Sequence, residues 1–332
     1  MGRVLVTGGA GFIGSHVADA LISRGHEVHV LDDLSGGFRE NVPAAAAFVH
    51  GSTADADAVE RLFARVRFTH VYHLAAYAAE GLSHFIKRFN YTNNVIGSVN
   101  LLNASVMSGV EVFVFASSIA VYGDCPELPL TEGAPPHPED SYGIAKYAVE
   151  LELGACRKMF GLDYIIFRPH NVFGARQNIS DPYRNVIGIF MNQILQGQPM
   201  TIFGDGTQTR AFSYIVDVAP LMAEAIDVAA ARNQVFNIGA DMPCSLNDLA
   251  RAVAAAMGVT ANVVHLAPRL EVQHAHSAHD RIRGVFGERS QTCLQDGLEE
   301  MAAWVRRHGA RPSVPFTGIE ILKNLPAAWQ RG

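Results

Sequence analysis

A tyrosine and a lysine four positions apart are the first candidates for chemistry in this chain of 332 residues. Tyr142 and Lys146 would lie on one face of a helix, because side chains four apart are neighbours there. A tyrosine with a pKa of about 10 is a poor base at neutral pH. A neighbouring ammonium and a positively charged ring would stabilise its phenolate. Ser117 and Ser118 end an apolar run upstream, where a hydroxyl can reach the same substrate oxygen.

A glycine-rich turn near the N-terminus predicts a dinucleotide site. Gly8, Gly11 and Gly14 follow an apolar run and open a helical pattern. Glycine permits the close approach of a pyrophosphate, which the free N–H groups of a helix start can bind. Asp32 ends the next apolar run, where its carboxylate can accept both ribose hydroxyls of NAD, and with Asp33 it would repel the extra phosphate of NADP. We therefore expect NAD; the alternative is that the two aspartates are solvated turn residues.

These residues require a fold that brings strand ends together, and the first half of the chain has such a pattern. Short apolar runs alternate with segments of helical spacing, which is typical of a parallel sheet covered on both faces. We predict an α/β fold, a Rossmann-type doubly wound parallel sheet. The expected strands are Arg3–Thr7, Glu27–Leu31, Ala47–His50, His70–Ala75, Val110–Ala116 and Asp163–Phe167, and the expected helices are Phe12–Arg24, Asp55–Val66, Asn93–Met107 and Tyr142–Phe160.

After Arg168 the alternation loosens and turn residues multiply, which indicates a smaller mixed α/β lobe that binds substrate. Within it we expect helices over Ser245–Met257 and Leu298–His308. We place the dinucleotide-binding domain at residues 1–170, with a segment of about 211–240 able to rejoin it. The substrate-binding lobe takes residues 171–332.

Composition and charge exclude several other classes of function. The net charge is −6 and no basic cluster is present, so nucleic-acid binding is not expected. No signal peptide is recognisable, and no apolar run approaches the roughly 20 residues that span a bilayer. The four cysteines are scattered, which favours reduced thiols and a cytoplasmic location. His274, His276 and His279 resemble part of a metal-ligand string, but the predicted chemistry needs no metal and we expect none.

The order of these motifs resembles that of the extended short-chain dehydrogenase/reductases. Within them, the chain is most similar to the NAD-dependent nucleotide-sugar epimerase/dehydratase group and its UDP-glucose or UDP-glucuronate 4-epimerases. The resemblance covers nearly the whole chain. It rests on Thr7–Gly14, Asp32, His73–Ala76, Asn94, Ser117-Ser118, Val121–Gly123, Tyr142 with Lys146, Arg168–Gly174 and Phe203–Asp217.

The resemblance implies a role for each matching residue. Tyr142 would be the base, Lys146 its activator and a ribose ligand, and Ser118 the hydroxyl that bonds the reacting sugar oxygen. The expected cofactor contacts are Gly8, Gly11, Phe12, Ile13, Gly14, Asp32, Asp33, Ser52, Leu74, Ala75, Ala76, Asn94, Ser117, Tyr142 and Lys146. The expected substrate contacts are Glu80, Ser118, His170, Asn171, Asn185, Arg210, Arg269 and His276. As alternatives, Asn94 and Asn171 could cap a helix or a turn, and the arginines could be solvated.

Some positions depart from the family pattern. Ser52 stands where the family usually has an aspartate beside adenine, and the loop of Glu80 and His84 lacks a lysine that the UDP-glucose epimerases have there. Glu80, His84 and His276 point to a sugar other than plain UDP-glucose, or to tolerance of several sugars.

The residues after Ser118 favour epimerisation within the group. Dehydratases and decarboxylases of the family have acidic or polar residues there for further proton transfers, whereas Ile119 and Ala120 can move no proton. The implied activity is epimerisation of a UDP-sugar at C4 through a 4-keto intermediate, with transient hydride transfer to tightly bound NAD. The alternatives are a nucleotide-sugar dehydrogenase or ketoreductase that releases NADH, and a regulator that binds NAD without chemistry. The family also implies a homodimer through a four-helix bundle, here Asn93–Met107 with Tyr142–Phe160.

Overall fold

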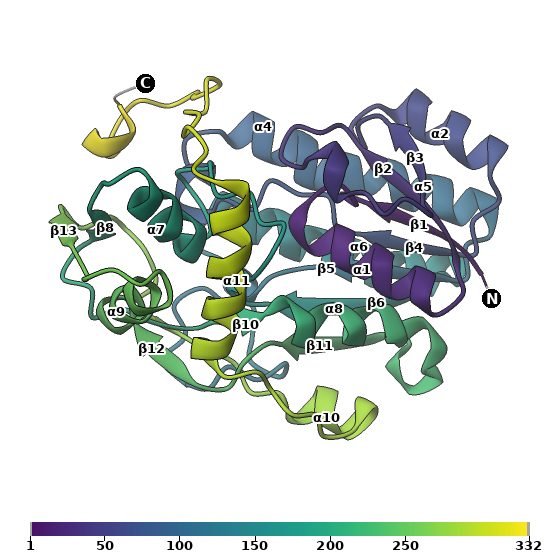
Figure 1. Cartoon of the computed structure of the whole chain (residues 1–332). Helices are drawn as coiled ribbons and strands as arrows, with labels where there is room; N and C mark the ends of the chain where they lie inside the picture. Colours follow the sequence, from purple (N-terminus) through teal and green to yellow (C-terminus); the bar gives the residue numbers. More distant parts are fainter. Residues whose placement is uncertain (1, 331–332) are drawn as a thin grey trace.

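A seven-stranded parallel sheet lies at the centre of the computed structural model, which describes residues 2–330 (Figure 1). From one edge to the other, its strands are β11 (Gln234–Ile238), β6 (Asp163–Pro169), β5 (Val112–Ala116), β4 (His70–His73), β1 (Arg3–Thr7), β2 (Glu27–Asp32) and β3 (Ala47–His50). The strand order reverses between β1 and β4, and open parallel sheets bind ligands at the carboxyl ends of the strands beside such a reversal. The predicted Rossmann-type fold is confirmed.

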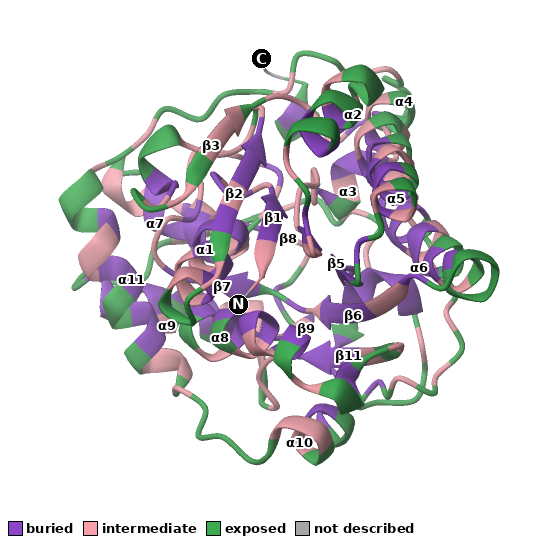
Figure 2. Cartoon of the chain, turned by 90° about the vertical axis from the view of Figure 1, so that its right-hand side faces the viewer, coloured by how far each residue is buried: buried purple, intermediate pink, exposed green. Residues whose placement is uncertain are grey.

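Helices cover both faces of the sheet (Figures 1 and 2). Successive side chains of a strand point to opposite faces, so Val4 and Val6 join one apolar core and Leu5 joins the other. The first core lies under α1 (Phe12–Ser23) and α8 (Ile215–Glu224), and the second under α2 (Ala56–Arg65), α5 (Gly97–Ser108) and α6 (Ser141–Phe160). The burial of both faces explains why the strands are almost entirely apolar.

The predicted elements are present, and most of their ends shift by a few residues. A turn of the wider π-type helix, η2 (Thr92–Ile96), precedes α5. The final helix, α11 (Leu294–His308), begins at Leu294 instead of Leu298, because the Cys293 thiol accepts the N–H of Asp296 and caps it. Strand β11 is absent from the predicted strands; it pairs with β6 and extends the sheet at its edge.

A smaller lobe lies beyond the carboxyl ends of the strands (Figure 1). Its helices α7 (Val186–Leu195), α9 (Leu246–Ala256) and α11 pack around a separate apolar core. Its short strands are β7 (Val172–Phe173) with β10 (Ser213–Tyr214), β8 (Met200–Phe203) with β13 (Val263–Leu266), and β9 (Thr209–Ala211) between β12 (Pro243–Ser245) and β14 (His274–Ala275). The shorter helices of the chain are α3 (Glu80–Ser83), α4 (Lys87–Tyr91) and α10 (Asp280–Phe286). No helix among residues 2–330 is both long enough and apolar enough to cross a membrane.

The chain after α11 connects the small lobe to the sheet side of the molecule. The carboxylate of Glu320 accepts the N–H groups of Arg88 and Phe89, both at 3.0 Å, at the start of α4. Further on, the Trp329 ring packs edge-on against Tyr183 of the small lobe, with ring centroids 5.2 Å apart. This C-terminal segment therefore contacts both sides of the region between the lobes.

A buried ion pair fixes α6 on the sheet. The Arg168 guanidinium of β6 donates hydrogen bonds of 2.9 and 2.5 Å to the Glu150 carboxylate of α6, and both side chains are 5% exposed. The Ser117 hydroxyl, at the end of β5, donates to the same carboxylate at 2.5 Å. Removal of one partner would leave the other as an uncompensated charge in the interior.

We expect Glu150→Ala to lower the free energy of unfolding by about 3–5 kcal/mol, because the buried Arg168 charge loses its partner. Chemical denaturation of the purified protein measures this change. As a control, Asp227→Ala removes the half-exposed partner of Arg24. This variant should lower the free energy of unfolding by at most about 1 kcal/mol. Equal losses in the two variants would contradict the role assigned to the buried pair.

Candidate active site

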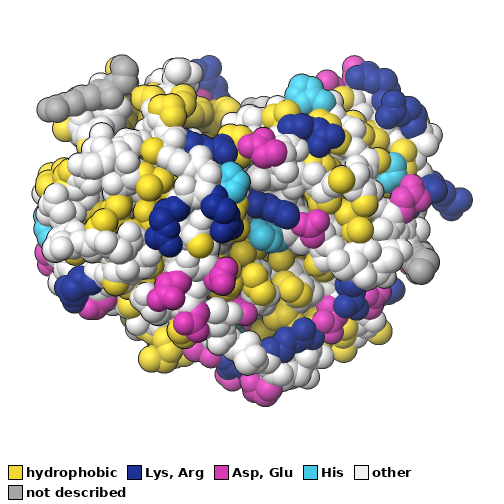
Figure 3. Space-filling model, in the orientation of Figure 1, with side chains coloured by type: hydrophobic (Ala, Val, Ile, Leu, Met, Phe, Trp, Pro, Cys, Tyr) yellow, Lys and Arg dark blue, Asp and Glu magenta, His cyan; other side chains and the backbone are white. Residues whose placement is uncertain are grey.

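A cavity of about 340 Å³ lies between the end of the sheet and the small lobe. The first lobe contributes the start of α1, the end of β5 and the start of α6 to its wall. The predicted site residues that line it are Phe12, Ile13, Glu80, Ser117, Ser118, Tyr142, Asn171, Asn185, Arg210 and Arg269. On the face of the molecule shown in Figure 3, basic side chains gather in the region between the two lobes, with acidic side chains beside them. Charges of both signs are thus placed locally, whatever the net charge of the chain.

The predicted glycine turn joins β1 to α1. Gly8 has a φ of +71°, in the left-handed region that favours glycine. A Cβ atom at Gly14 would lie 2.1 Å from the Gly8 carbonyl oxygen, and one at Gly8 would lie 2.7 Å from the backbone of Ala75. The N-cap residue is Gly11, so no cap side chain competes for the first N–H groups of α1. The turn therefore fits a pyrophosphate at a helix N-terminus.

Asp32 lies at the end of β2, next to this turn. Its Oδ2 accepts the N–H of Ala10 at 3.0 Å, and its Oδ1 accepts the N–H of Leu34 at 2.8 Å. Burial raises the pKa of this carboxyl, and the two N–H groups oppose the rise. Each carboxylate oxygen has a further lone pair for a ribose hydroxyl. Asp33 instead accepts the N–H of Ser35 at 2.9 Å, within its own turn.

Further predicted cofactor contacts lie beside the carboxyl ends of β3 and β4. Leu74–Ala76 follow β4, and the backbone of Leu74 and Ala75 lies close to Gly8. Asn94 is buried, and its side chain accepts the N–H of Tyr77 at 3.1 Å and donates to the carbonyl of the same residue at 3.3 Å. It thereby holds the loop after β4, and it does not cap a helix. Ser52 lies after β3, where the N–H of Gly51 donates to the Asp32 carbonyl at 3.1 Å, and its hydroxyl accepts an N–H of its own loop at 3.3 Å.

Helix α6 presents the predicted catalytic tyrosine to the cavity. The Asp140 carboxylate caps this helix by accepting the N–H groups of Tyr142 and of the next residue, each at 2.9 Å. Tyr142 is buried beside Ser118, whose hydroxyl oxygen accepts the N–H of Ala120 at 3.1 Å. The serine is thereby held at the end of β5. The start of α6 and the end of β5 thus bring the hydroxyl groups of Tyr142 and Ser118 into the same cavity.

Lys146 lies below the tyrosine, in the interior. Its ammonium donates to the Ala116 carbonyl at 2.7 Å and lies 4.7 Å from the Phe115 ring centroid and 5.7 Å from that of Tyr142. Burial lowers the pKa of Lys146 to about 7, while the charge of Glu150 opposes the change. The ammonium thus titrates near neutrality.

The protein by itself does not lower the pKa of Tyr142. Burial raises this pKa, the charge of Glu80 raises it further, and a hydrogen bond with Ser118 lowers it. The stabilisation predicted for the phenolate therefore needs the positively charged ring as well as the lysine, because desolvation disfavours the charged form of both side chains. The positively charged nicotinamide ring of NAD, expected from the sequence, would lower the pKa of Tyr142.

Two arginines predicted to contact the substrate line the cavity and are held by partners within the protein. Arg210 donates to the carbonyls of Val272 at 2.5 Å and Gln273 at 3.0 Å. Arg269 pairs with Glu271 at 2.8 Å, and its guanidinium lies 4.6 Å from the ring centroid of Phe203. Both cations are thus oriented by the protein alone, and neither is a solvated side chain.

Two further residues of this region were not singled out from the sequence. Arg184 pairs with Asp181 at 2.8 Å and lines the cavity next to Asn185. Its position directly before a predicted ligand is a signal that could have identified it. Trp329 lies behind Arg269, with the guanidinium carbon 5.6 Å from its ring centroid. No local pattern marks a tryptophan near the end of the chain as part of this site.

Two predicted substrate contacts, His170 and His276, are not among the residues that line the cavity. His170 is buried; its Nδ1 lies 3.1 Å from the Ala211 carbonyl oxygen, and its Nε2 lies 3.2 Å from Nε2 of His279. Both ring nitrogens have partners in the interior, so we do not retain His170 as a substrate ligand. The carbonyl of His276 accepts the N–H of Leu130 at 2.9 Å.

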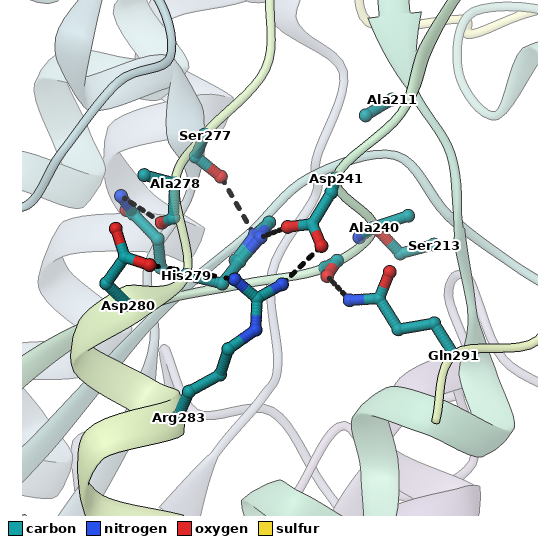
Figure 4. A network of polar contacts seen from close by, with 12 residues as sticks. Ala211, Ser213, Ala240, Asp241, Ser277, Ala278, His279, Asp280, Arg283 and Gln291 are labelled. Atoms are coloured by element: carbon teal, nitrogen blue, oxygen red, sulfur yellow. Dashed lines mark hydrogen bonds and ion pairs between the residues drawn. The ribbon is translucent and has the colours of Figure 1, made fainter. Parts of the chain in front are cut away.

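Of the histidines that resembled a metal-ligand string, His279 lies in the network of Figure 4. Nδ1 of His274 lies 2.9 Å from the Thr209 hydroxyl, and the buried Nδ1 of His276 has no hydrogen-bond partner among residues 2–330. His279 Nδ1 lies 2.6 Å from the Asp241 carboxylate, and its Nε2 lies 3.1 Å from the Ser277 hydroxyl. Arg283 of α10 pairs with the same carboxylate. The order serine, histidine, aspartate matches a hydrolase triad, but Ser277 is 2% exposed. A substrate therefore cannot reach its hydroxyl, and the contacts hold α10 against the rest of the chain.

Comparison with known proteins connects this geometry to one family. Residues 4–239 match the model of the NAD dependent epimerase/dehydratase family. The UDP-glucose 4-epimerase of Mycolicibacterium smegmatis is 36% identical over 313 residues, which cover 92% of this chain and 98% of that protein. The UDP-glucose 4-epimerase of Thermotoga maritima, solved with UDP-glucose, is 36% identical with a TM-score of 0.87, covering 92% and 99% of the two chains. The UDP-glucose 4-epimerase of Thermus thermophilus, solved with NAD, is 36% identical with a TM-score of 0.86 and the same coverage.

We expect Gly14→Ala to reduce the affinity for NAD by at least about tenfold, or about 1.4 kcal/mol. The added methyl group would meet the Gly8 carbonyl oxygen at 2.1 Å, so the turn would have to open. The NAD content of the purified protein and calorimetric titration measure the change. The control is Gly154→Ala on α6, where, apart from the backbone of the helix itself, no heavy atom of residues 2–330 lies within 4 Å of the added Cβ. This variant should bind NAD normally. Full NAD occupancy in Gly14→Ala would refute the assigned role of the turn.

Proposed function

Because the chain belongs to the NAD-dependent epimerase/dehydratase family, we propose that it is an epimerase that inverts C4 of a UDP-sugar. The observation that carries this proposal is the placement of Ser118, Tyr142 and Lys146 at one end of the sheet, beside the glycine turn. Ile119 and Ala120 are buried and supply no further acid or base. The site therefore supports oxidation and re-reduction at a single carbon.

Each residue of the site has a defined task in this proposal. Tyr142 holds and moves one proton at its phenolic oxygen, taking it from the sugar 4-hydroxyl and returning it. Ser118 bonds the same sugar oxygen, and the Lys146 ammonium supplies positive charge close to the phenol. The glycine turn and Asp32 would hold NAD, which when bound supplies the acceptor and donor of the hydride.

The far part of the cavity is suited to the diphosphate of a nucleotide sugar. Arg184, Arg210 and Arg269 line it, and guanidinium groups bind phosphate with two parallel hydrogen bonds. Asn185 precedes α7 with a φ of +66°, and the first residues of that helix also line the cavity. The N-terminus of α7 thus adds a favourable dipole for an anion. Asn171, with a φ of +41°, lines the same wall.

The two alternative functions are less well supported. A dehydrogenase or ketoreductase that releases NADH, or a regulator without chemistry, would need another explanation for the similarity to epimerases over nearly the whole chain. The regulator also does not require the intact set of Ser118, Tyr142 and Lys146.

We also propose a homodimer in which α5 and α6 of two copies form a four-helix bundle. These helices carry exposed apolar side chains: Met107 is 85% exposed and Met159 is 76% exposed. Exposed large apolar residues on neighbouring helices favour burial against a second copy.

All four cysteines are free thiols, which supports the expected reducing, cytoplasmic location.

The purified protein should interconvert UDP-glucose and UDP-galactose without added cofactor and without net NADH. Tyr142→Phe should lower turnover by about 10²–10⁴-fold, because the proton acceptor is lost, while NAD remains bound. Tyr147→Phe, on the same helix, is the matched control and should retain activity. A coupled assay for UDP-galactose measures turnover, and absorbance measures any net formation of NADH. Stoichiometric NADH would indicate the dehydrogenase, and bound NAD without turnover of any nucleotide sugar would indicate the regulator.

A further inference from the structure

One carboxyl group in the cavity wall has no task in the mechanism above. Glu80 begins α3 and is exposed to the cavity that Tyr142 also lines. None of the hydrogen bonds among residues 2–330 engages its carboxyl oxygens, so these atoms are available to a ligand. The other acid beside the tyrosine, Asp140, already accepts N–H groups at the start of α6.

The backbone holds Glu80 next to the catalytic helix. The Ser83 hydroxyl donates to the Glu80 carbonyl at 2.6 Å and accepts the N–H of Tyr142 at 3.1 Å. One side chain thus links the first residue of α3 to the catalytic residue of α6. On the other side, a Cβ atom at Gly81 would lie 3.2 Å from the Trp329 ring, so α3 is enclosed between α6 and the C-terminal segment.

Two acids and two arginines that line the same cavity act on Glu80. The groups that act on it are Asp140 of α6, Arg210 of β9, and Arg269 and Glu271 of the segment before β14. Enclosure by protein and the Asp140 carboxyl raise the pKa of Glu80, and the two arginines oppose this. Glu80 in turn is the charge that most raises the pKa of Tyr142. Glu80 and Asp140 line the same cavity as Tyr142, beside which the reacting sugar carbon would lie.

We propose that Glu80 selects the sugar of the nucleotide-sugar substrate. It accepts a hydrogen bond from a hydroxyl or an amine of the sugar, and it repels a sugar that carries a carboxylate. The substrate class is then a nucleotide of a neutral or amino hexose, and a nucleotide of a uronic acid is excluded. This inference rests on the proposed function, because it assumes that the sugar ring lies beside Tyr142.

The physical reason is the repulsion between like charges in the cavity wall. The two arginines that act on Glu80 are oriented by Glu271 and by backbone carbonyls, and they are assigned to the diphosphate. A carboxylate on the sugar would meet the carboxyl groups of Glu80 and Asp140. Like charges juxtaposed in this way discriminate strongly between ligands. A hydroxyl or ammonium group at the same place would instead find an acceptor.

The test measures binding as well as turnover. In the Tyr142→Phe background with bound NAD, calorimetry compares the affinities for UDP-glucose and UDP-glucuronate, with and without Glu80→Gln. With Glu80 present, we expect UDP-glucose to bind more tightly than UDP-glucuronate. Glu80→Gln should shift the ratio of the two affinities by about tenfold towards UDP-glucuronate. Glu80→Asp, which keeps the charge, should preserve the original ratio. Glu139→Gln removes another carboxylate that lines the cavity and should also leave the ratio unchanged.

A second measurement separates electrostatic selection from a structural role. Glu80 raises the pKa of Tyr142, and turnover needs the deprotonated phenol. With Tyr142 intact, Glu80→Gln should therefore shift the acid limb of the pH profile of UDP-glucose turnover to lower pH. An unchanged affinity ratio, or tighter binding of UDP-glucuronate in the presence of Glu80, would overturn the inference. A shifted binding ratio without turnover by the wild-type protein would support the selection and count against the epimerase.

Discussion

The contact between the Glu150 carboxylate and the Arg168 guanidinium is the constraint on which the active site depends. It joins α6, which carries Tyr142 and Lys146, to β6, and it also receives the Ser117 hydroxyl from the end of β5. Because both charges are buried, any misalignment would leave one of them without compensation. The distance between the helix and the strand ends is therefore tightly defined, and with it the distance between the tyrosine and the serine.

Burial and local charge together set the chemistry of this site. Desolvation lowers the pKa of Lys146 and raises that of Tyr142, so the protein alone opposes the ionised form of each group. Catalysis then depends on positive charge brought close to the phenol. Acids and arginines line the same cavity, and the net charge of −6 is no obstacle to an anionic ligand. Attraction comes from a few oriented groups and two helix N-termini.

Much of the fold and part of the site can be predicted from local patterns. The glycine turn, Asp32, and the tyrosine and lysine four apart each lie within one strand, one turn or one helix. Their relative positions follow from geometry that the local sequence imposes. Strand β11 escaped prediction because it lies in the looser second half and joins the sheet only through pairing with β6.

The doubly wound sheet, the dinucleotide turn and the candidates Ser118, Tyr142 and Lys146 follow from the amino-acid sequence, because periodicity and backbone conformation are short-range properties. That His170 points into the interior and that Trp329 packs against Arg269 becomes visible only in the folded chain. The same is true of the cavity that Glu80 shares with Tyr142. These relations join positions that lie far apart in the chain. Their energies depend on which surfaces are buried together, and no local pattern records that.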